Sequence, residues 1–186
     1  WAKWVTPSRD LISTFKQEGD EVRFKESVVY YDCGWSNYYP SDNYPFMYKC
    51  RSANSSIIKY RYADVLLLKA EALIMQDTPD LEGAADIIDE VRDRAKLGAL
   101  SSSTRSNKDA LLNALLKERR LELAFEGQRW FDLVRLDKVE EVMNAVHAKD
   151  SGRKAQVYTY DKNSYRLPIP QSVIDANDKI HQNPGY

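Results

Sequence analysis

Hydrophobic residues recur at helical spacing through the middle of the chain. Residues 61–75 are apolar at nearly every position, which predicts a helix buried on several sides. After the capping residue Asp80, apolar positions recur every three or four residues until Gly98 ends the pattern: Leu81, Ala84, Ile88, Val91 and Ala95. This spacing predicts a second helix that packs on the first. A polar linker then leads to a third helical segment, so we expect one helical hairpin followed by another.

The third helical segment carries charges where its apolar stripe should continue. Leu111 and Leu115 lie on one face, and steps of three or four residues lead from them to Glu118, Glu122 and Glu126. Carboxylates survive burial only when they are paired and hydrogen-bonded, and arginines can hold them through two bonds. We therefore predict a helix over residues 108–127 and interpret its charges as a buried clamp, paired with each other or with charges on neighbouring helices. The residues of the predicted clamp are Glu118, Arg119, Glu122, Glu126, Arg129, Asp132 and Arg135.

The first 60 residues show weaker periodicity. A proline and hydroxyl residues precede apolar positions at Leu11, Ile12 and Phe15, which predicts a short helix. Alternating apolar positions over residues 22–30 then predict an extended segment. From residue 33 to 50, aromatic residues stand among glycine and prolines, which predicts an irregular aromatic loop. We thus expect an extended and aromatic region (1–60), a helical core (61–147), and a loop with an extended tail (148–186).

The aromatic loop is the candidate ligand site. Sugar rings have an apolar face that stacks on Trp and Tyr, and amides such as Asn37 and Asn43 can bond sugar hydroxyls. The alternative is that these aromatic residues pack the loop onto the helices. The predicted ligand contacts are Trp35, Tyr38, Tyr39 and Tyr44.

Composition and charge exclude several functions. The 186 residues include 27 basic and 28 acidic ones, mixed along the chain, so no basic face is available for nucleic acid. No apolar run approaches the roughly 20 residues of a membrane-spanning helix, and the first residues do not resemble a signal peptide. His147 and His181 stand far apart without ligand spacing, and there is no phosphate loop or nucleophile elbow. We expect no metal and no cofactor.

The two cysteines, Cys33 and Cys50, lie at the ends of the aromatic loop. Their spacing is that of neither a zinc site nor a redox motif. A disulfide and two free thiols remain open from the sequence, since disulfides are rare in the cytosol and common outside it.

Five motifs, in order, closely resemble those of the SusD/RagB family. They are Arg61-Tyr62-Ala63-Asp64-Val65-Leu66-Leu67-Leu68 with Ala70-Glu71-Ala72-Leu73, Val91-Arg92-Asp93-Arg94-Ala95, the block 118–135, Leu167-Pro168-Ile169-Pro170, and Gln182-Asn183-Pro184-Gly185-Tyr186. The resemblance covers nearly the whole chain and implies a single C-terminal SusD/RagB-like domain, residues 1–186, without the family's N-terminal part. It implies a mainly α fold of helical hairpins resembling tetratricopeptide repeats, with long loops and an extended C-terminal tail.

The resemblance also implies a function. SusD/RagB proteins are lipid-anchored to the outer membrane at the cell surface, bind nutrients, usually glycans such as oligosaccharides, and have no catalytic activity. They act with a SusC-type TonB-dependent transporter, and their anchor belongs to an N-terminal part that this chain lacks. In such a secreted protein, we expect a disulfide between Cys33 and Cys50.

Two other functions fit parts of this sequence. The helical hairpins alone would suit a repeat scaffold that binds proteins. Glu118, Glu122 and Glu126 could instead serve a glycoside hydrolase, since four residues of helix rise about 6 Å, close to the carboxylate separation in retaining enzymes. Neighbouring arginines argue against a hydrolase, because they lower the pKa that a general acid needs raised. If these three carboxylates are buried against arginines, their role is structural. If they are open to a cleft, the hydrolase is favoured.

Overall fold

The computed structural model describes residues 5–49, 52, 57–146 and 159–186, and it divides into two compact units. Residues 61–147, predicted as one helical core, are shared between units 1–129 and 130–186. Elements of the first unit are α1 (Arg9–Glu18), α2 (Glu21–Ser27), β1 (Val28–Tyr31), η1 (Ser41–Asn43), β2 (Tyr44–Met47), α3 (Tyr62–Met75), α4 (Leu81–Arg94), α5 (Ser102–Arg105) and α6 (Lys108–Glu122). Next come α7 (Arg129–Arg135), α8 (Val139–Asn144), η2 (Lys162–Tyr165) and α10 (Gln171–Asp175).

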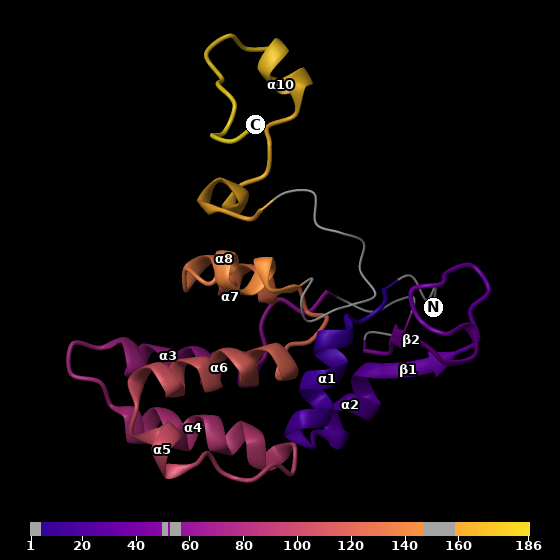
Figure 1. The fold of residues 1–186 in the computed structure, drawn as a ribbon. Helices are drawn as coiled ribbons and strands as arrows, with labels where there is room; N and C mark the ends of the chain where they lie inside the picture. The colour runs from indigo at the N-terminus through magenta and orange to yellow at the C-terminus, as the bar shows by residue number, and fades with distance from the viewer. Residues whose placement is uncertain (1–4, 50–51, 53–56, 147–158) are drawn as a thin grey trace. The chain divides into compact units, whose positions relative to one another are not determined.

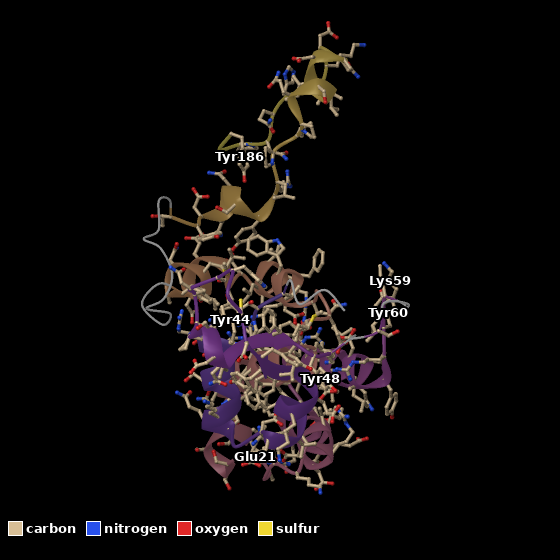
Figure 2. The ribbon with its side chains drawn as sticks, turned by 90° about the vertical axis from the view of Figure 1, so that its right-hand side faces the viewer. Glu21, Tyr44, Tyr48, Lys59, Tyr60 and Tyr186 are labelled. Carbon is tan, nitrogen blue, oxygen red and sulfur yellow. The ribbon has the colours of Figure 1, made fainter. Side chains whose placement is uncertain are left out.

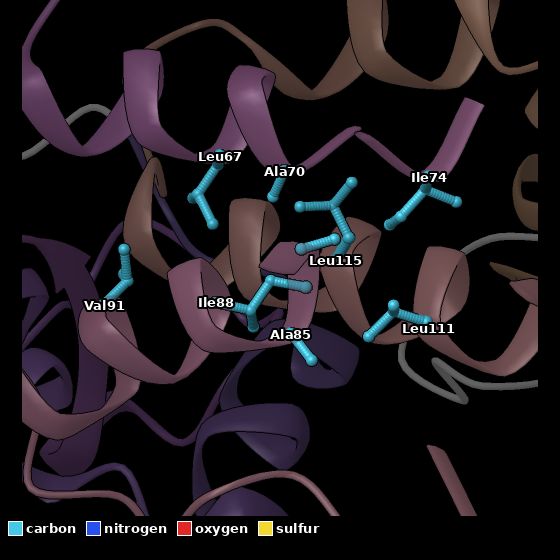
Figure 3. Packing of buried hydrophobic residues seen from close by; sticks show 9 residues of the cluster. Leu67, Ala70, Ile74, Ala85, Ile88, Val91, Leu111 and Leu115 are labelled. Atoms are coloured by element: carbon cyan, nitrogen blue, oxygen red, sulfur yellow. The ribbon is translucent and has the colours of Figure 1, made fainter. Parts of the chain in front are cut away.

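Helices α3, α4 and α6 form the core of the first unit and lie side by side (Figure 1). Their facing side chains form one buried apolar cluster, and small alanines let the helix backbones approach closely (Figure 3). Each fully buried Leu or Ile in it contributes about 1.5 to 3 kcal/mol. The predicted hairpin and the apolar stripe of α6 are confirmed. The buried residues are Leu67, Ala70, Ile74, Ala84, Ala85, Ile88, Val91, Leu111 and Leu115.

Helix α3 is less buried than its composition predicts. Its buried residues lie on one stripe, which faces α4 and α6. Another apolar stripe is exposed, formed by Tyr62, Val65, Leu68 and Met75. Tyr60, two residues before the start of α3, is also exposed and is labelled in Figure 2. The prediction that α3 is buried on several sides is therefore wrong for the described part of the chain.

Residues 21–27 form helix α2, where the alternating pattern predicted extended chain. The Asp20 side chain caps this helix by accepting a hydrogen bond from the backbone N–H of Arg23 (3.2 Å). Gly19 turns the chain between α1 and α2 with a φ of 68°, a conformation that favours glycine. The extended prediction holds from Val28 onward, in β1. A period of two over a few residues cannot distinguish a strand from a capped helical turn.

Strands β1 and β2 pair in antiparallel register, with Val28 opposite Met47 and Tyr31 opposite Tyr44. Strand β2 lies inside the segment that was predicted to be irregular. Pro45 has no N–H to donate, but β2 pairs with only one other strand in this two-stranded sheet, so a proline is tolerated on the side away from β1. The prolines therefore misled the prediction at this point.

Helix α6 ends at Glu122, five residues before the predicted end. Phe125 and Gly127 have φ values of 67° and 82°, which are incompatible with a continuing right-handed helix. Arg129, Asp132 and Arg135 consequently lie on the separate helix α7.

In the second unit, two of the sequence motifs bind each other. The Gln182 side chain accepts a hydrogen bond from the N–H of Ile169 (2.8 Å) and donates one to its carbonyl (2.9 Å), as a neighbouring strand would. Asn183 donates to the carbonyl of Leu167 (2.7 Å). The prolines of Leu167-Pro168-Ile169-Pro170 keep this segment out of helix, as predicted. None of the helices in the described ranges has the length and apolar character needed to cross a bilayer.

Candidate functional site

The carboxylates on the inner face of α6 are buried and paired with arginines. Glu118 and Glu122 are 1% and 3% exposed. Glu118 accepts hydrogen bonds from Arg23 Nη1 (2.6 Å) and Arg92 Nη1 (3.2 Å), one on each carboxylate oxygen. Burial in ion pairs is what the helical spacing of these residues predicts.

Glu122 and Glu126 are held by cations from several elements. Glu122 accepts from Arg23 (3.0 Å) on Oε2, and from Arg61 (2.5 Å) and Arg94 on Oε1. Arg61 also donates to Glu126 Oε2 (2.8 Å), and Lys49 forms an ion pair with Glu126 Oε1. The network thus joins α2, α4, α6 and the segments before α3.

The partners of these carboxylates include charges on the neighbouring helices α2 and α4, which is one of the two pairings that the sequence predicts. Among the arginines of the predicted clamp, Arg119 pairs with Asp64 of α3 (2.9 Å), Arg135 pairs with Asp132 (2.8 Å), and the half-buried Arg129 donates to the carbonyl of Leu116 (3.2 Å). The sequence pattern did not identify which arginines on α2, before α3 and on α4 bind the carboxylates. Arg92 follows Ile88 by four residues, so an arginine on an apolar stripe was the available signal.

The two central carboxyl groups have pKa values shifted in opposite directions. Burial raises the pKa of Glu118 and outweighs the opposing effect of Arg23 and Arg92. Burial would also raise the pKa of Glu122, but hydrogen bonds and charges from Arg61, Arg94 and Arg23 together lower it. The carboxyl group with the raised pKa has both oxygens bound by arginines, which favours a structural role.

The aromatic residues lie around an open hollow of about 860 Å³ in the first unit. Trp35 is 62% exposed, and its ring packs against Tyr44 and Phe46, with centroids 6.0 and 5.9 Å away. The hollow therefore presents a large, supported aromatic surface to solvent. Its lining residues are Arg9, Cys33, Gly34, Trp35, Ser36, Asn37, Tyr38, Tyr39, Pro40 and Ser41.

Tyr38 and Tyr39 are held in place beside Trp35. The Arg9 guanidinium lies 4.2 and 4.4 Å from their ring centroids and donates a hydrogen bond to the Tyr38 carbonyl. The Tyr39 hydroxyl donates to the carbonyl of Pro7 (3.0 Å). Both rings are half-buried, so their positions are fixed before any ligand arrives.

Tyr44 does not belong to the exposed surface. It is 2% exposed, and its hydroxyl shares a hydrogen bond with the Ser36 hydroxyl (2.7 Å). Because Tyr44 begins β2 and packs on Phe46 and Cys33, it supports the hollow from beneath. The prediction that Tyr44 contacts ligand is therefore wrong. Tyr44 is one of the aromatic residues that pack the loop onto the rest of the protein.

Cys33 is a free, buried thiol in the structure, packed among the same aromatic side chains. It acts there as a small apolar residue. Cys50, its predicted disulfide partner, lies outside the described residues, as does His147. Within the ranges that the structure describes, no group of three or more His, Cys, Asp or Glu side chains is placed to hold a metal ion.

Comparison with protein families and known proteins gives consistent results. The family model described as the SusD family matches residues 42–186. Two proteins of Formosa agariphila are similar: SusD-like protein P38, 41% identical over 139 residues, and SusD-like protein P2, 34% identical over 142. These matches cover 72% and 73% of this chain but 25% and 27% of the relatives. The chain therefore spans about a quarter of their length.

Solved structures share the fold. A SusD superfamily protein from Bacteroides vulgatus matches 97% of this chain and 44% of its own, with a TM-score of 0.70 at 22% identity. A laminarin-binding SusD-like protein matches 98% of this chain and 40% of its own, with a TM-score of 0.60 at 27% identity. The fold is therefore the mainly helical, tetratricopeptide-like fold of these proteins.

Proposed function

Because this chain belongs to the SusD family, we propose that it is a non-catalytic, glycan-binding part of a nutrient-uptake system at the outer membrane. A structural neighbour described as laminarin-binding supports a glycan as the ligand. A repeat scaffold for protein binding would share the helical hairpins, but the family match favours the uptake function.

The observation that carries this proposal is the exposed Trp35 in its hollow. An indole that is 62% exposed and supported from below offers a flat apolar surface for a sugar ring. Asn37 and Ser41 line the same hollow and can bond sugar hydroxyls. We therefore place the ligand contacts of this chain at Trp35, Tyr38 and Tyr39.

The carboxylates of α6 do not support the hydrolase alternative. A retaining hydrolase needs one carboxyl group free to donate a proton to its substrate. The oxygens of Glu118 are bound to Arg23 and Arg92, and the pKa of Glu122 is lowered rather than raised. These groups stabilise the fold in our proposal.

Partner and location follow from the family. We propose that the full-length protein carries a lipid anchor, faces outward from the outer membrane, and acts with a SusC-type TonB-dependent transporter. Copurification of a TonB-dependent transporter with the tagged full-length protein from solubilised outer membranes would support this partnership.

The ligand site is tested by calorimetry of full-length wild type and Trp35→Ala with laminarin oligosaccharides and other soluble glycans. Losing one stacking contact should weaken binding about tenfold. Because Trp35 is largely exposed, the melting temperature should change little. Phe131→Ala removes a similarly exposed aromatic side chain from the second unit and serves as the control.

Two results would contradict the proposed site. Equal glycan affinity of wild type and Trp35→Ala would place the binding site elsewhere. Unfolding of Trp35→Ala would show that the aromatic loop has a structural role.

A further inference from the structure

Helix α3 carries apolar residues on two sides. Leu67, Ala70 and Ile74 point from it toward α4 and α6 and belong to the buried core (Figure 3). On another side, apolar residues recur at steps of three or four, so they form one continuous strip along the whole helix. All of them are exposed, the four large ones by 38% to 72%. We call them the outer stripe: Tyr62, Val65, Leu68, Ala72 and Met75.

The other two helices of the core have polar exposed sides. Every exposed residue of α4 is charged, and every exposed residue of α6 is charged or carries an amide. Among the exposed residues of α3, which the structure describes over its full length, only Lys69 is charged. The outer stripe is therefore particular to α3. The exposed residues are Glu82, Asp86, Glu90, Asp93 and Arg94 on α4, and Lys108, Asp109, Asn113 and Lys117 on α6.

A continuous apolar strip of this length indicates a contact surface. Apolar residues that are exposed singly are normal on a soluble protein, whereas contiguous ones mark a surface that packs against something else. Lys69 borders the outer stripe, and its long side chain can keep its ammonium group in water beside a covering helix. The outer stripe thus fits an apolar partner better than it fits water.

The packing of the core indicates what kind of partner fits. In repeat folds built from helical hairpins, one hairpin cannot bury its apolar faces alone, and neighbouring helices stack on it. Helix α6 packs against both α3 and α4, so it already supplies one neighbour to the α3–α4 hairpin. A second neighbour that suits the outer stripe is another helix, with its own apolar side turned toward α3.

The lengths of similar proteins indicate where such a helix comes from. This chain covers 25% and 27% of its two relatives from Formosa agariphila, and 44% of a structure that shares its fold. More than half of each of these proteins therefore lies outside the part that matches. A covering helix then needs neither a second copy of the protein nor a separate partner.

We propose that, in the full-length protein, a helix from outside residues 1–186 packs its apolar side on the outer stripe of α3. This helix continues the stack that α3, α4 and α6 begin. The proposal depends on the family match but not on glycan binding, so it and the proposed ligand site at Trp35 can fail separately.

Thiol labelling of the full-length protein tests whether the outer stripe is covered. Val65→Cys and Met75→Cys place a thiol on the stripe, and Asn113→Cys places one on the exposed polar side of α6 as the control. A covered thiol reacts only when the covering helix opens, so maleimide should label the first two at least about tenfold more slowly than the control. Mass spectrometry of peptides separates these sites from the native cysteines. Equal rates at all three positions in the native protein would overturn the proposal.

Dilution of the purified full-length protein shows which molecule covers the stripe. A helix of the same polypeptide protects the two thiols equally at every protein concentration. Protection that disappears as the protein is diluted would assign the cover to a second copy and overturn the proposal. A stripe covered only by a separate partner protein would be unprotected in the purified protein, which would overturn it as well.

A charge on the stripe gives an independent test. Under a covering helix, Val65→Lys buries an ammonium group and should lower the melting temperature of the full-length protein by about 5 °C or more, or prevent folding. On an uncovered helix the same change is harmless, because lysine forms helix better than valine does. Asn113→Lys is the matched control and should leave the melting temperature nearly unchanged. A melting temperature of Val65→Lys at or above that of wild type would overturn the proposal.

Discussion

Glu122 is the residue on which the charge network converges. Three arginines from separate parts of the chain, Arg23, Arg61 and Arg94, bind its two carboxylate oxygens. Arg61 also donates from Nη2 to the backbone carbonyl of Glu122 (2.5 Å). Removing this one carboxylate therefore takes an acceptor from three cations at once, although Arg23 keeps Asp20 and Glu118, and Arg61 keeps Glu126.

Replacing Glu122 by alanine should lower the free energy of unfolding by about 3 to 5 kcal/mol, the range for breaking a buried ion pair from one side. Denaturant titration of wild type and Glu122→Ala measures this loss. Glu82→Ala is the control, because its carboxylate is largely exposed beside Arg105, and it should cost less than about 1 kcal/mol. Equal stability of Glu122→Ala and wild type would contradict the structural role of the network.

The lowered pKa of Glu122 predicts the pH dependence of stability. A carboxyl group whose pKa is lowered by folding stabilises the protein above its ordinary value of 4.5, and loses that contribution as the pH falls through the lowered value. Glu118, with a raised pKa, contributes in the opposite sense. Thermal melts of wild type should therefore show stability falling below pH 4.5, and Glu122→Gln should show a weaker fall. An unchanged pH profile in Glu122→Gln would contradict this assignment.

At the scale of elements, the sequence predicted the helices whose apolar residues repeat over several turns. Helices α3, α4 and α6 each continue for 14 or 15 residues, long enough for their period to be unambiguous. Helix α2 has only seven residues, too few for its period to be recognised, and its buried Arg23 pairs with Glu118, 95 positions away. Local patterns cannot show such a partner, which is why α2 was missed, whereas β2 was missed because of its proline.

The importance of the α2 cap can be tested at Asp20. This residue caps α2 and also pairs with Arg23 while almost fully buried. Asp20→Ala should thus cost more than the roughly 1 kcal/mol of a cap alone. Asn107→Ala removes the cap of α6, which involves no ion pair, and provides the comparison in urea unfolding. Equal losses in the two variants would show that the Asp20 pair adds nothing.

For the whole molecule, the family motifs predicted the fold better than periodicity did. The pairing of Leu167-Pro168-Ile169-Pro170 with Gln182 and Asn183 gives a physical reason for two of them, since side-chain amides there replace a missing strand. The residue types of the candidate site were predictable, because aromatic residues in an irregular loop with glycine and prolines favour ligand binding. Which aromatics are exposed depends on the β1 and β2 pairing, which places Tyr44 inside and leaves Trp35 outside.

The charge network also bears on how long the protein stays folded. Its bonds join residues far apart in sequence: 95 positions separate Arg23 from Glu118, and 61 separate Arg61 from Glu122. Helices α3 and α4 are neighbours in the chain, so their contacts close at a smaller entropic cost and should form earlier. Interactions that form after the rate-limiting step slow unfolding and leave folding nearly unchanged. In stopped-flow experiments, Glu122→Ala should therefore unfold faster and refold at nearly the wild-type rate, so that the buried charges set the lifetime of the native state.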